Sequence, residues 1–525
     1  MRILYKIANK LFRIVKKILK LLTSRMVIIG VALLLEFCWL AGIMMQLNEK
    51  SVYINYAVTI LSLIAVLSII NNPKMNPGYK LMWAVCILAL PVTGICLYGI
   101  LGHSSVARKF RTHYDTVLLS QGGVLGEEEE TRKKLEEENI LAAGQSSYLT
   151  NYAHYPVYEN TETEYYPLGD VWFEHFIEEL KKAEHYIFME YFIISEGYLW
   201  DTVLEILKEK AAAGVDVRLI YDDFGCVTTL PYQYYKSLQQ MGIKCAAFNQ
   251  FRPVLNVILN NRDHRKIAVI DGHTAFSGGV NLADEYINEK VRFGHWKDTG
   301  FMLKGEAVWN YTVMFLRMWN AHRHTDESYE AFRPHVWHPE AFEGQGFIQP
   351  YSDSPLDDER LGENVYLNIL NRAKDYVYIF TPYLIVDHEM QTALCLAAKR
   401  GVDVRIMTPG IPDKKTIFQL TRSYYPVLLK AGVRIYEYTP GFLHAKSFVC
   451  DDEAAVVGTI NKDYRSLYLH FECGTFFYQN PLVMDVKRDS LTTMEKGREI
   501  ALSDTRQGFF GSLFCAVLRV FSPLL

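Results

Sequence analysis

The sequence predicts an α/β protein with two pseudo-symmetric halves that share one active site, preceded by an N-terminal transmembrane helical anchor. The first observation is an internal repeat at about 180 to 190 residues, which is the length of a domain and too long for a solenoid unit. AEHYIFMEYFII (183–194) parallels AKDYVYIFTPYLIV (373–386), and AAAGVDVRLI (211–220) parallels AAKRGVDVRIM (397–407). The second observation is a series of long apolar stretches before residue 102.

Each half alternates helices and strands. An amphipathic helix precedes an apolar strand, and a second helix ends at a glycine before a Gly-Val-Asp-Val-Arg strand, at 214–218 and at 401–405. This alternation favours a mainly parallel sheet with helices packed outside it. We expect the first half at 148–345 and the second half at 346–508. A chain of 525 residues that is 50% hydrophobic is long and apolar enough to build two cores.

The N-terminal region has the composition of a membrane anchor. Residues 2–25 carry eight basic residues and no acidic residue, which is typical of an amphipathic helix on an anionic membrane surface. Three apolar stretches follow, each near the roughly 20 residues that cross a bilayer. They are Met26–Leu47, Val52–Ile70 and Leu81–Leu101. We therefore expect a basic amphipathic helix at 1–25 and an anchor with two to three transmembrane helices at 26–110, in a multi-pass membrane protein.

The orientation of this anchor stays open. Three crossings would place the basic N-terminus and the rest of the chain on opposite sides of the membrane. Arg108, Lys109 and Arg111, just after the last apolar stretch, favour the same side as that terminus under the positive-inside rule. The number of crossings and the side of the catalytic domain therefore cannot both be fixed from the sequence.

Two further segments flank the repeated region. Residues 111–147 are expected to be a charged linker or solvated helix, because they contain the run GEEEETRKKLEEEN (126–139). Residues 509–525 form an apolar C-terminal segment that is marginal in length for a membrane crossing. We expect this segment to dock at the membrane-facing side of the catalytic unit.

Composition argues against several classes of function. The formal net charge of −4 and the isoelectric point near 6.4 give no general attraction to nucleic acid, so no nucleic-acid partner is expected. The nine cysteines are scattered without C-x-x-C pairs, which indicates neither a disulfide scaffold nor a zinc site.

One polar motif occurs in both halves. DHRKIAVIDGHTAFSGGVN (263–281) and FLHAKSFVCDDEAAVVGTIN (442–461) each read H-x-K-x-x-x-x-D, then six residues, then G-[GT]-x-N. A single copy would prove little, but two copies with the same offsets make coincidence a poor explanation. The motif residues are His264, Lys266, Asp271 and Asn281 in the first half, and His444, Lys446, Asp451 and Asn461 in the second.

The strand-like setting of the motif predicts where its side chains point. Because side chains alternate along a strand, His264 and Lys266 share one face, as do His444 and Lys446. Asp271 and Asp451 begin turns, so each aspartate either fixes its turn or contacts substrate, and the turn is the favoured interpretation.

Two further acids occupy matched positions. Asp298 in WKDTG and Glu472 in HFECG each stand in a [DE]-x-G segment that opens a strand, 34 and 28 residues after the motif histidines. A carboxylate hydrogen-bonded to an imidazole would fix its tautomer and raise its basicity. The alternative is a strand-edge acid that faces water.

Paired His, Lys and Asn residues suit the chemistry of a phosphodiester. Ammonium and amide donors stabilise the non-bridging oxygens, whose negative charge grows in the transition state. One histidine attacks phosphorus, while the other protonates the leaving alkoxide and then deprotonates the acceptor. No acidic ligand sits at metal-binding spacing beside His264 or His444, so neither a metal nor another cofactor is expected.

These motifs resemble the HKD motifs of the phospholipase D superfamily. NNRDHRKIAVIDG, GGVNLADEYI, HWKDTG, GTINKDYRSL and the terminal FSPLL further resemble bacterial cardiolipin synthases, over roughly residues 79–525. The resemblance implies two phospholipase D-like halves around one site in the bacterial cell membrane, with phosphatidylglycerol and anionic membrane lipids as partners. It is compatible with a homo-oligomer. It implies a reaction that joins two phosphatidylglycerols into cardiolipin, with release of glycerol and through a phosphohistidine intermediate.

The resemblance also implies individual roles. His264 and His444 match the catalytic histidines, Lys266 and Lys446 the phosphate-binding lysines, and Asn281 and Asn461 the supporting amides. Gly279 and Thr459 stand where many members have serine, so the two halves need not bind phosphate equally. His470 stands where a polar amide is expected. The resemblance favours His264 as the nucleophile.

Other functions use the same residues. A hydrolase, either a phospholipase or a nuclease, would employ water as the acceptor, and a membrane scaffold would retain an inactive site. Intact motifs in both halves disfavour the scaffold, and the predicted anchor disfavours the nuclease. A site that opens at a bilayer meets a high local concentration of lipid hydroxyls, which favours transfer over hydrolysis.

Overall fold

The described residues fall into two compact units. A computed structural model describes residues 30–31, 33–38, 49–73, 75–102, 107–120, 123–126, 129–250, 261–323, 325, 327–357 and 359–524. The small unit comprises the described residues within Met1–Arg108, together with Val520–Pro523. The large unit comprises those within Lys109–Phe251 and Asn260–Arg519, together with Leu524. The predicted amphipathic helix at 1–25 lies outside the described residues.

The third apolar stretch of the small unit is not one continuous helix. The second predicted stretch lies in α3 (Glu49–Ile70), whereas Leu81–Leu101 is divided between α4 (Pro77–Ala89) and α5 (Pro91–Leu101). Leu90 adopts φ −134° and ψ 77°, because the residue before a proline is driven out of the helical region. A side chain at Gly94 would lie 2.6 Å from the carbonyl oxygen of Cys86, so α4 and α5 pack closely. The stretch expected as a candidate third crossing is therefore divided between two helices at Leu90.

The transmembrane part of the anchor is not confirmed. Within the described ranges, no helix combines the length and the apolar content that a membrane crossing requires. The first predicted stretch, Met26–Leu47, lies mostly outside those ranges.

The first half of the large unit is built on a seven-stranded sheet with the order β1-β8-β6-β5-β2-β3-β4. Only β2, β3 and β4 run parallel to one another, while the other neighbours are antiparallel. The strands are β1 (Thr161–Tyr166), β2 (Tyr186–Tyr191), β3 (Asp216–Asp222), β4 (Lys244–Phe248), β5 (Lys266–Ile270), β6 (Thr274–Gly278) and β8 (Gly300–Gly305).

The second half repeats this arrangement in an eight-stranded sheet, β19-β13-β12-β10-β15-β16-β18-β9. Its parallel strands are β10, β12 and β13. The matching order confirms the predicted pair of α/β halves. The strands are β9 (Phe347–Asp353), β10 (Tyr376–Phe380), β12 (Asp403–Pro409), β13 (Arg434–Tyr438), β15 (Ser447–Cys450), β16 (Ala454–Gly458), β18 (Glu472–Tyr478) and β19 (Gly497–Glu499).

The expectation of mainly parallel sheets is wrong, and the motif hairpins are the reason. β5, which begins with Lys266, turns back directly into β6. In the same way β15, which follows Lys446, turns back into β16. The turns contain residues with positive φ, at 49° for Asp271 and 74° for Gly272, and at 52° for Asp451. Asp and Gly tolerate this left-handed conformation, which tight hairpins require, so the strands on that side of each sheet become antiparallel.

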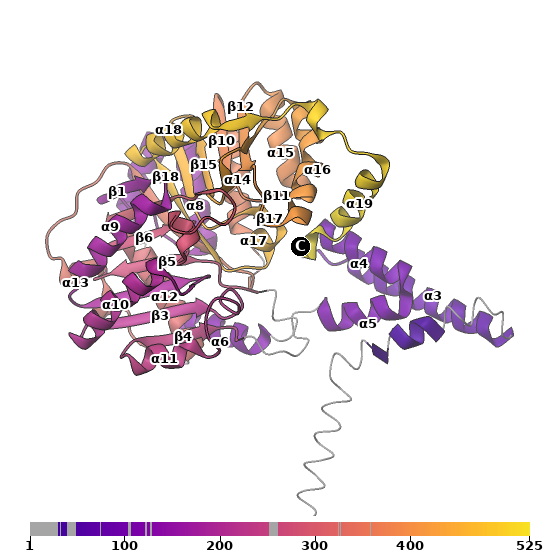
Figure 1. Ribbon diagram of the computed structural model, residues 1–525, viewed down its shortest axis with the longest axis horizontal. Coiled ribbons are helices and arrows are strands. Elements are labelled where there is room, and N and C mark those ends of the chain that lie inside the picture. The colour runs from indigo at the N-terminus through magenta and orange to yellow at the C-terminus, as the bar shows by residue number, and fades with distance from the viewer. Residues whose placement is uncertain are drawn as a thin grey trace, which may run out of the picture. The chain divides into compact units, whose positions relative to one another are not determined.

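Helices cover these sheets, and others occupy the segment expected as a charged linker (Figure 1). The charge run forms α7, where i,i+4 ion pairs such as Lys133–Glu129 line the exposed face. The helices of the large unit are α6 (Ala107–Ser120), α7 (Glu129–Glu138), α8 (Ile140–Ala153), α9 (Gly169–Lys182), α10 (Tyr198–Ala212), α11 (Tyr234–Gln240), α12 (Val308–Arg323), α13 (Pro334–Trp337), α14 (Leu361–Arg372), α15 (His388–Lys399), α16 (Lys415–Ala431), α17 (Tyr464–Tyr468), α18 (Pro481–Glu495) and α19 (Phe509–Val520).

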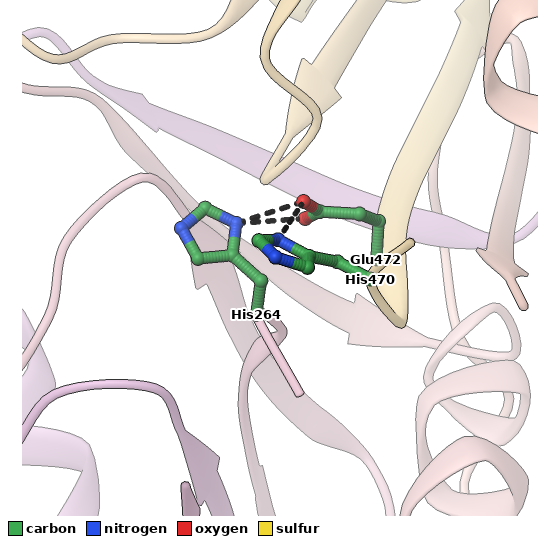
Figure 2. A group of neighbouring side chains, drawn as sticks. All are labelled: His264, His470 and Glu472. Atoms are coloured by element: carbon green, nitrogen blue, oxygen red, sulfur yellow. Dashed lines mark hydrogen bonds and ion pairs between the residues drawn. The ribbon is translucent and has the colours of Figure 1, made fainter. Parts of the chain in front are cut away.

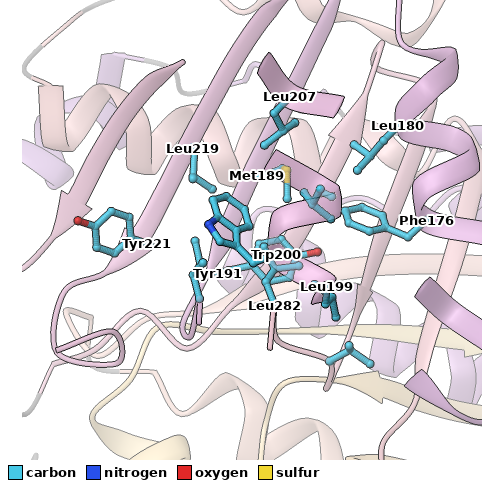
Figure 3. Packing of buried hydrophobic residues seen from close by; sticks show 14 of the residues in the cluster. Phe176, Leu180, Met189, Tyr191, Leu199, Trp200, Leu207, Leu219, Tyr221 and Leu282 are labelled. Atoms are coloured by element: carbon cyan, nitrogen blue, oxygen red, sulfur yellow. The ribbon is translucent and has the colours of Figure 1, made fainter. Parts of the chain in front are cut away.

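A buried apolar core supports the strands behind the first motif (Figure 3). Phe176 of α9 and Trp200 of α10 pack into one cluster with Met189 of β2 and Leu219 of β3. Each such side chain stabilises the fold by about 1.5 to 3 kcal/mol relative to an exposed position. Since β2 pairs with β5 from Ile187 to Tyr191, this core holds the strand that begins with Lys266.

Short main-chain pairings join the two halves. β7 (His295–Lys297) of the first half runs parallel to β14 (Gly441–Leu443) of the second half. In the reciprocal place, Asp263 of the first half forms an isolated bridge with Phe471 of the second half. Each motif histidine therefore follows a segment that is bonded to the other half.

Candidate active site

The two motif histidines face one cavity of about 510 Å³. Residues from both halves line it, including His264 and Asn281 from the first half and His444, Asn461 and His470 from the second. The duplicated motifs therefore meet at one site, although about 180 residues separate them in the chain.

Each histidine is bound by an acid from the opposite half. His264 Nδ1 lies 2.9 Å from both carboxylate oxygens of Glu472, and His444 Nδ1 lies 2.6 Å from Asp298 Oδ2. Both carboxylates are fully buried. Because an ionised carboxylate only accepts hydrogen bonds, each imidazole carries its proton on Nδ1 and keeps the lone pair on Nε2.

Main-chain hydrogen bonds set this crossed arrangement. The His264 amide donates to the carbonyl of Phe471 at 2.9 Å, and the His444 amide donates to the carbonyl of Lys297 at 2.7 Å. The residue after each acceptor is the acid, Glu472 or Asp298. The same backbone contact thus brings each acid to the histidine of the other half.

The electrostatics of the site keep both imidazoles neutral near neutral pH. Burial lowers the pKa of His264 to about 3 and that of His444 to about 4. Burial alone would raise the pKa of Glu472, but its close interaction with the His264 ring brings that pKa below its ordinary value. The pKa of Asp298 is lowered in the same way by His444 and Lys446, against the effect of burial. A neutral imidazole beside an ionised carboxylate is a competent nucleophile or base.

The two lysines lie behind the histidines, and their contacts differ. Lys266 Nζ donates to the carbonyl of His264 at 2.6 Å. Lys446 Nζ contacts the carbonyl of His444 and also lies 2.8 and 3.0 Å from the Nδ1 and Nε2 atoms of that ring. Burial lowers the pKa of Lys266 to about 8 and that of Lys446 to about 7. Among the described residues, His444 alone of the two motif histidines has an ammonium group against its ring nitrogens.

The asparagines and their neighbours also differ between the halves. Asn281 is fixed, because its carbonyl oxygen accepts from the Ile193 amide at 3.0 Å and its amide donates to the Tyr286 hydroxyl at 2.7 Å. The Asn461 carbonyl oxygen has no hydrogen-bond partner within the described part of the chain. The amide oxygen is therefore available for a hydrogen bond at Asn461, whereas at Asn281 it is already bonded to the main chain.

Gly279 and Thr459 are explained by the acids beside them. A Cβ atom at Gly279 would lie 1.9 Å from Asp298 Oδ1, so a side chain there would displace the carboxylate that holds His444. At the matching position, Thr459 Oγ1 donates to Glu472 Oε2 at 2.5 Å. The first half therefore lacks a hydroxyl because its acid occupies that space.

Comparison with known proteins places both halves of the repeat in one family. Residues 176–319 and 366–490 match the family described as "Cardiolipin synthase, PLD-like domain", and these ranges contain both motifs. A protein named cardiolipin synthase from Halalkalibacterium halodurans is 34% identical over 86% of this chain and 90% of its own length. This chain belongs to the cardiolipin synthase family.

Further similarities extend over the rest of the chain. Residues 60–103 match a family described as "Phospholipase_D-nuclease N-terminal". A Streptococcus mutans protein without a described function is 44% identical over 88% of this chain and 99% of its own length. The crystal structure of a phosphatidylserine synthase from Haemophilus influenzae superimposes with a TM-score of 0.55 at 14% identity, covering 72% of this chain and 97% of that one. At this identity the likeness shows the fold alone.

Within this cardiolipin synthase fold, the motif aspartates are used by the backbone. Asp271 accepts hydrogen bonds at 2.8 Å from the amides of Glu184, His185 and Tyr186, at the start of β2. Asp451 accepts in the same manner from residues 374–376, at the start of β10. Neither aspartate lines the cavity. A catalytic role for them is therefore not supported, because their carboxylates hold the hairpin turns.

Two aromatic rings, those of Trp296 and His470, complete the site; the sequence singles out His470 but gives Trp296 no role. The Trp296 ring lies 5.5 Å from the His444 ring, and the His470 ring lies 5.7 Å from the His264 ring. Trp296 and His470 each stand two residues before an acid, Asp298 or Glu472. This shared spacing gives them equivalent places in the repeat, so alignment of the two [DE]-x-G segments identifies Trp296 as the counterpart of His470.

Proposed function

We propose that this chain is a membrane phosphatidyltransferase that makes cardiolipin from two phosphatidylglycerol molecules and releases glycerol. The observation that carries the proposal is the pair of neutral histidines, each held by an acid from the opposite half, at one cavity. Double displacement needs this combination of one nucleophile and one acid-base catalyst. Membership in the cardiolipin synthase family supports the choice of substrate.

In the first step, Nε2 of His264 attacks the phosphorus atom of the first phosphatidylglycerol. A phosphorus–nitrogen bond forms, the bond from phosphorus to the glycerol oxygen breaks, and His444 gives a proton to that oxygen. The anionic phosphate favours the imidazolium form of His444, so we expect this ring to be protonated once substrate binds. His264 suits the role of nucleophile because, among the described residues, no ammonium group contacts its ring nitrogens. The ring nitrogens of His444, by contrast, are contacted by Lys446 Nζ.

In the second step, neutral His444 takes the proton from the free hydroxyl of a second phosphatidylglycerol. The resulting oxygen attacks phosphorus, the phosphorus–nitrogen bond breaks, and cardiolipin leaves with His264 restored. Both steps balance without a cofactor. In this scheme Asp298 and Glu472 position the histidines and favour their charged forms.

Four side chains are proposed to hold the phosphate oxygens. They are Lys266, Lys446, Asn281 and Asn461. The lysines are within reach of the histidines, and the amide oxygen of Asn461 has no hydrogen-bond partner among the described residues, so turning this amide toward the phosphate would break no hydrogen bond of that oxygen. Asp271 and Asp451 are proposed to fix the hairpins, as their backbone contacts support.

The second lipid requires a second anion site. Arg292 and Lys414 line the same cavity, and Lys414 is exposed to solvent. We propose that they attract the phosphate of the acceptor lipid, since an exposed cation near the mouth raises the local concentration of anions.

The small unit is proposed to attach the protein to the bacterial cell membrane. α3 exposes a dense set of apolar side chains, which include Leu61, Ile64 and Leu67. Contiguous exposed apolar surface on this scale marks interaction with a membrane or a protein. The prediction of several crossings rests on the apolar stretches of the sequence alone.

The test is a product analysis with the full-length protein in vesicles of phosphatidylglycerol that carries labelled phosphorus. The proposal predicts labelled cardiolipin and free glycerol in equal amounts, and no product with His264→Ala. Phosphatidic acid as the main labelled product would show that water is the acceptor and would replace the transferase with a hydrolase.

A further inference from the structure

A third histidine shares the acid that holds His264. His470 Nδ1 lies 3.7 Å from Glu472 Oε1, and His264 Nδ1 lies 2.9 Å from the same oxygen. Figure 2 shows both rings directed at this one carboxylate. One ligand atom from each of the three side chains lies within 4.8 Å of the other two. The group is buried, with Glu472 fully covered and the His470 side chain 10% exposed.

The ring of His470 has unused bonding capacity. Neither Nδ1 nor Nε2 has a hydrogen-bond partner within the described part of the chain. Buried polar groups in native proteins are nearly always paired, so each exception requires a physical explanation. His470 Nδ1 faces a carboxylate oxygen at 3.7 Å, which is close to the separation of two atoms that bind the same metal ion.

We propose that His264, His470 and Glu472 bind a divalent transition-metal ion of the Zn²⁺ class, and that the bound ion inhibits the enzyme. Two imidazole nitrogens and one carboxylate oxygen, with water in a fourth position, form a ligand set that Zn²⁺ prefers. Mg²⁺ and Ca²⁺ favour all-oxygen sites and are disfavoured here.

The side chains need little movement to bind a metal. Tetrahedral bonds to zinc of about 2.0 to 2.2 Å place two ligand atoms about 3.3 Å apart. The 2.9 Å separation of His264 Nδ1 and Glu472 Oε1 therefore has to open only slightly. On binding, the Nδ1 proton leaves to solvent as the metal–nitrogen bond forms.

Inhibition follows from which atom the ion occupies. The hydrogen bond from His264 Nδ1 to Glu472 fixes the ring and supplies electron density to Nε2. A metal on Nδ1 breaks that hydrogen bond and withdraws electron density, so Nε2 becomes a weaker nucleophile. The ion is thus a regulator of a metal-free reaction.

The other half provides an internal comparison. His444 and Asp298 form the same kind of pair, but Trp296 stands where the second half has His470. Among the described residues, the group around His264 is the one cluster of three potential ligands. We therefore expect one ion per chain.

The test begins with binding in detergent, on full-length protein from which metals have been removed by chelation. Co²⁺ is added and visible absorption records tetrahedral coordination, after which Zn²⁺ is added to displace Co²⁺. We expect one Co²⁺ per chain. His470→Asn should weaken binding by more than about a hundredfold, because even outer partners of metal ligands contribute tenfold to a hundredfold. His175→Asn, which removes an exposed histidine near Glu164, is the matched control and should bind like the wild type.

The second arm measures activity, with each variant compared to its own metal-free rate. Zn²⁺ should inhibit the wild type and His175→Asn, and spare whatever activity His470→Asn retains. Absence of Co²⁺ binding, equal binding by His470→Asn, or equal inhibition of all three proteins would overturn the proposal. The binding measurement uses no lipid substrate, so a failure to bind Co²⁺ would not contradict the proposed transferase activity. A protein that binds Co²⁺ but makes no cardiolipin would contradict the transferase activity and not the metal site.

Discussion

Glu472, in the second half, accepts the Nδ1–H of His264, in the first half, through both of its carboxylate oxygens. Asp298 and His444 form the reciprocal pair. Each half therefore contains a histidine without its acid and an acid without its histidine. The active site exists only when the halves are packed together, and the pairing makes catalysis depend on their interface.

Glu472→Gln tests this relationship. The amide oxygen can still accept the imidazole proton, but the negative charge that supports the imidazole is lost. We expect turnover to fall by about tenfold to a hundredfold, with little change in fold. The pH–rate profile should also change, because the ionisation of His264 responds to the charge next to it. A normal profile with normal turnover would mean that the acid has only a structural role.

The sequence predicts the acids but not their crossed partners. Asp298 and Glu472 are recognisable from the shared [DE]-x-G setting, and the duplicated motif identifies both histidines. Which acid reaches which histidine depends on the bridges between β7 and β14 and between Asp263 and Phe471. Those contacts join segments far apart in the chain, and local patterns carry no information about them.

Other differences had visible causes in the sequence. Pro91, in the middle of the stretch expected as a third span, removes an amide donor and restricts Leu90, so the sequence accounts for the break at this site. The antiparallel strands follow from the hairpin turns at Asp271 and Asp451, which the sequence shows and which override the parallel order that the α/β alternation favours. The need for glycine at position 279 could not be predicted from nearby residues, because Asp298, which fills the space of a side chain there, is brought next to it by the folding of the sheet.

The assignment of His264 as nucleophile predicts a covalent intermediate in one variant. With a phosphatidyl ester of p-nitrophenol, the leaving group needs no acid catalyst. His444→Ala should then release about one equivalent of nitrophenol and retain labelled phosphorus on the protein, because the second step lacks its base. His264→Ala should show neither the release nor the label. Labelling of His264→Ala alone would reverse the two roles.

The lysines predict a loss of activity as pH rises. The pKa of Lys446 is about 7 and that of Lys266 about 8, both lowered chiefly by burial, so each ammonium loses its proton above its pKa. The phosphate then meets an uncharged amine, and kcat/KM, which reports the free enzyme, should fall above about pH 7. Lys446→Arg keeps its charge and should move this decline to higher pH. The check is kcat/KM against pH for a short-chain soluble lipid, and an unchanged decline in Lys446→Arg would assign it to another group.

We expect Gly279→Ala to lower turnover by displacing Asp298. The added methyl carbon would meet a carboxylate oxygen at 1.9 Å, so either Asp298 or the strand has to move. Overpacking of this kind costs about 1 to 3 kcal/mol of stability. Turnover should fall by about tenfold to a hundredfold as His444 loses its acid. The matched substitution Thr459→Ser keeps the hydroxyl that binds Glu472 and should be near wild type. The check is to measure thermal unfolding and turnover for both variants. Normal turnover in Gly279→Ala would show that catalysis does not depend on the position of Asp298.

The C-terminal helix α19 predicts a specific requirement for bilayer substrate. One face docks on α16, where Cys515 Sγ contacts the Gln419 carbonyl at 3.8 Å and Arg519 Nε donates to Ser423 Oγ at 3.1 Å. The other face leaves Phe509 77% exposed and Phe510 82% exposed. Exposed aromatic side chains on an amphipathic helix bury favourably at the boundary between lipid headgroups and acyl chains.

Replacing both phenylalanines with serine leaves the docked face of α19 unchanged. We therefore expect activity on vesicle phosphatidylglycerol to fall much more than activity on a short-chain soluble phosphodiester, because only the vesicle substrate requires the site to sit at the bilayer. Cys515→Ser, which changes the docked face, is the comparison and should affect both substrates alike. Equal losses on both substrates in the double phenylalanine variant would mean that α19 stabilises the fold and does not engage the membrane.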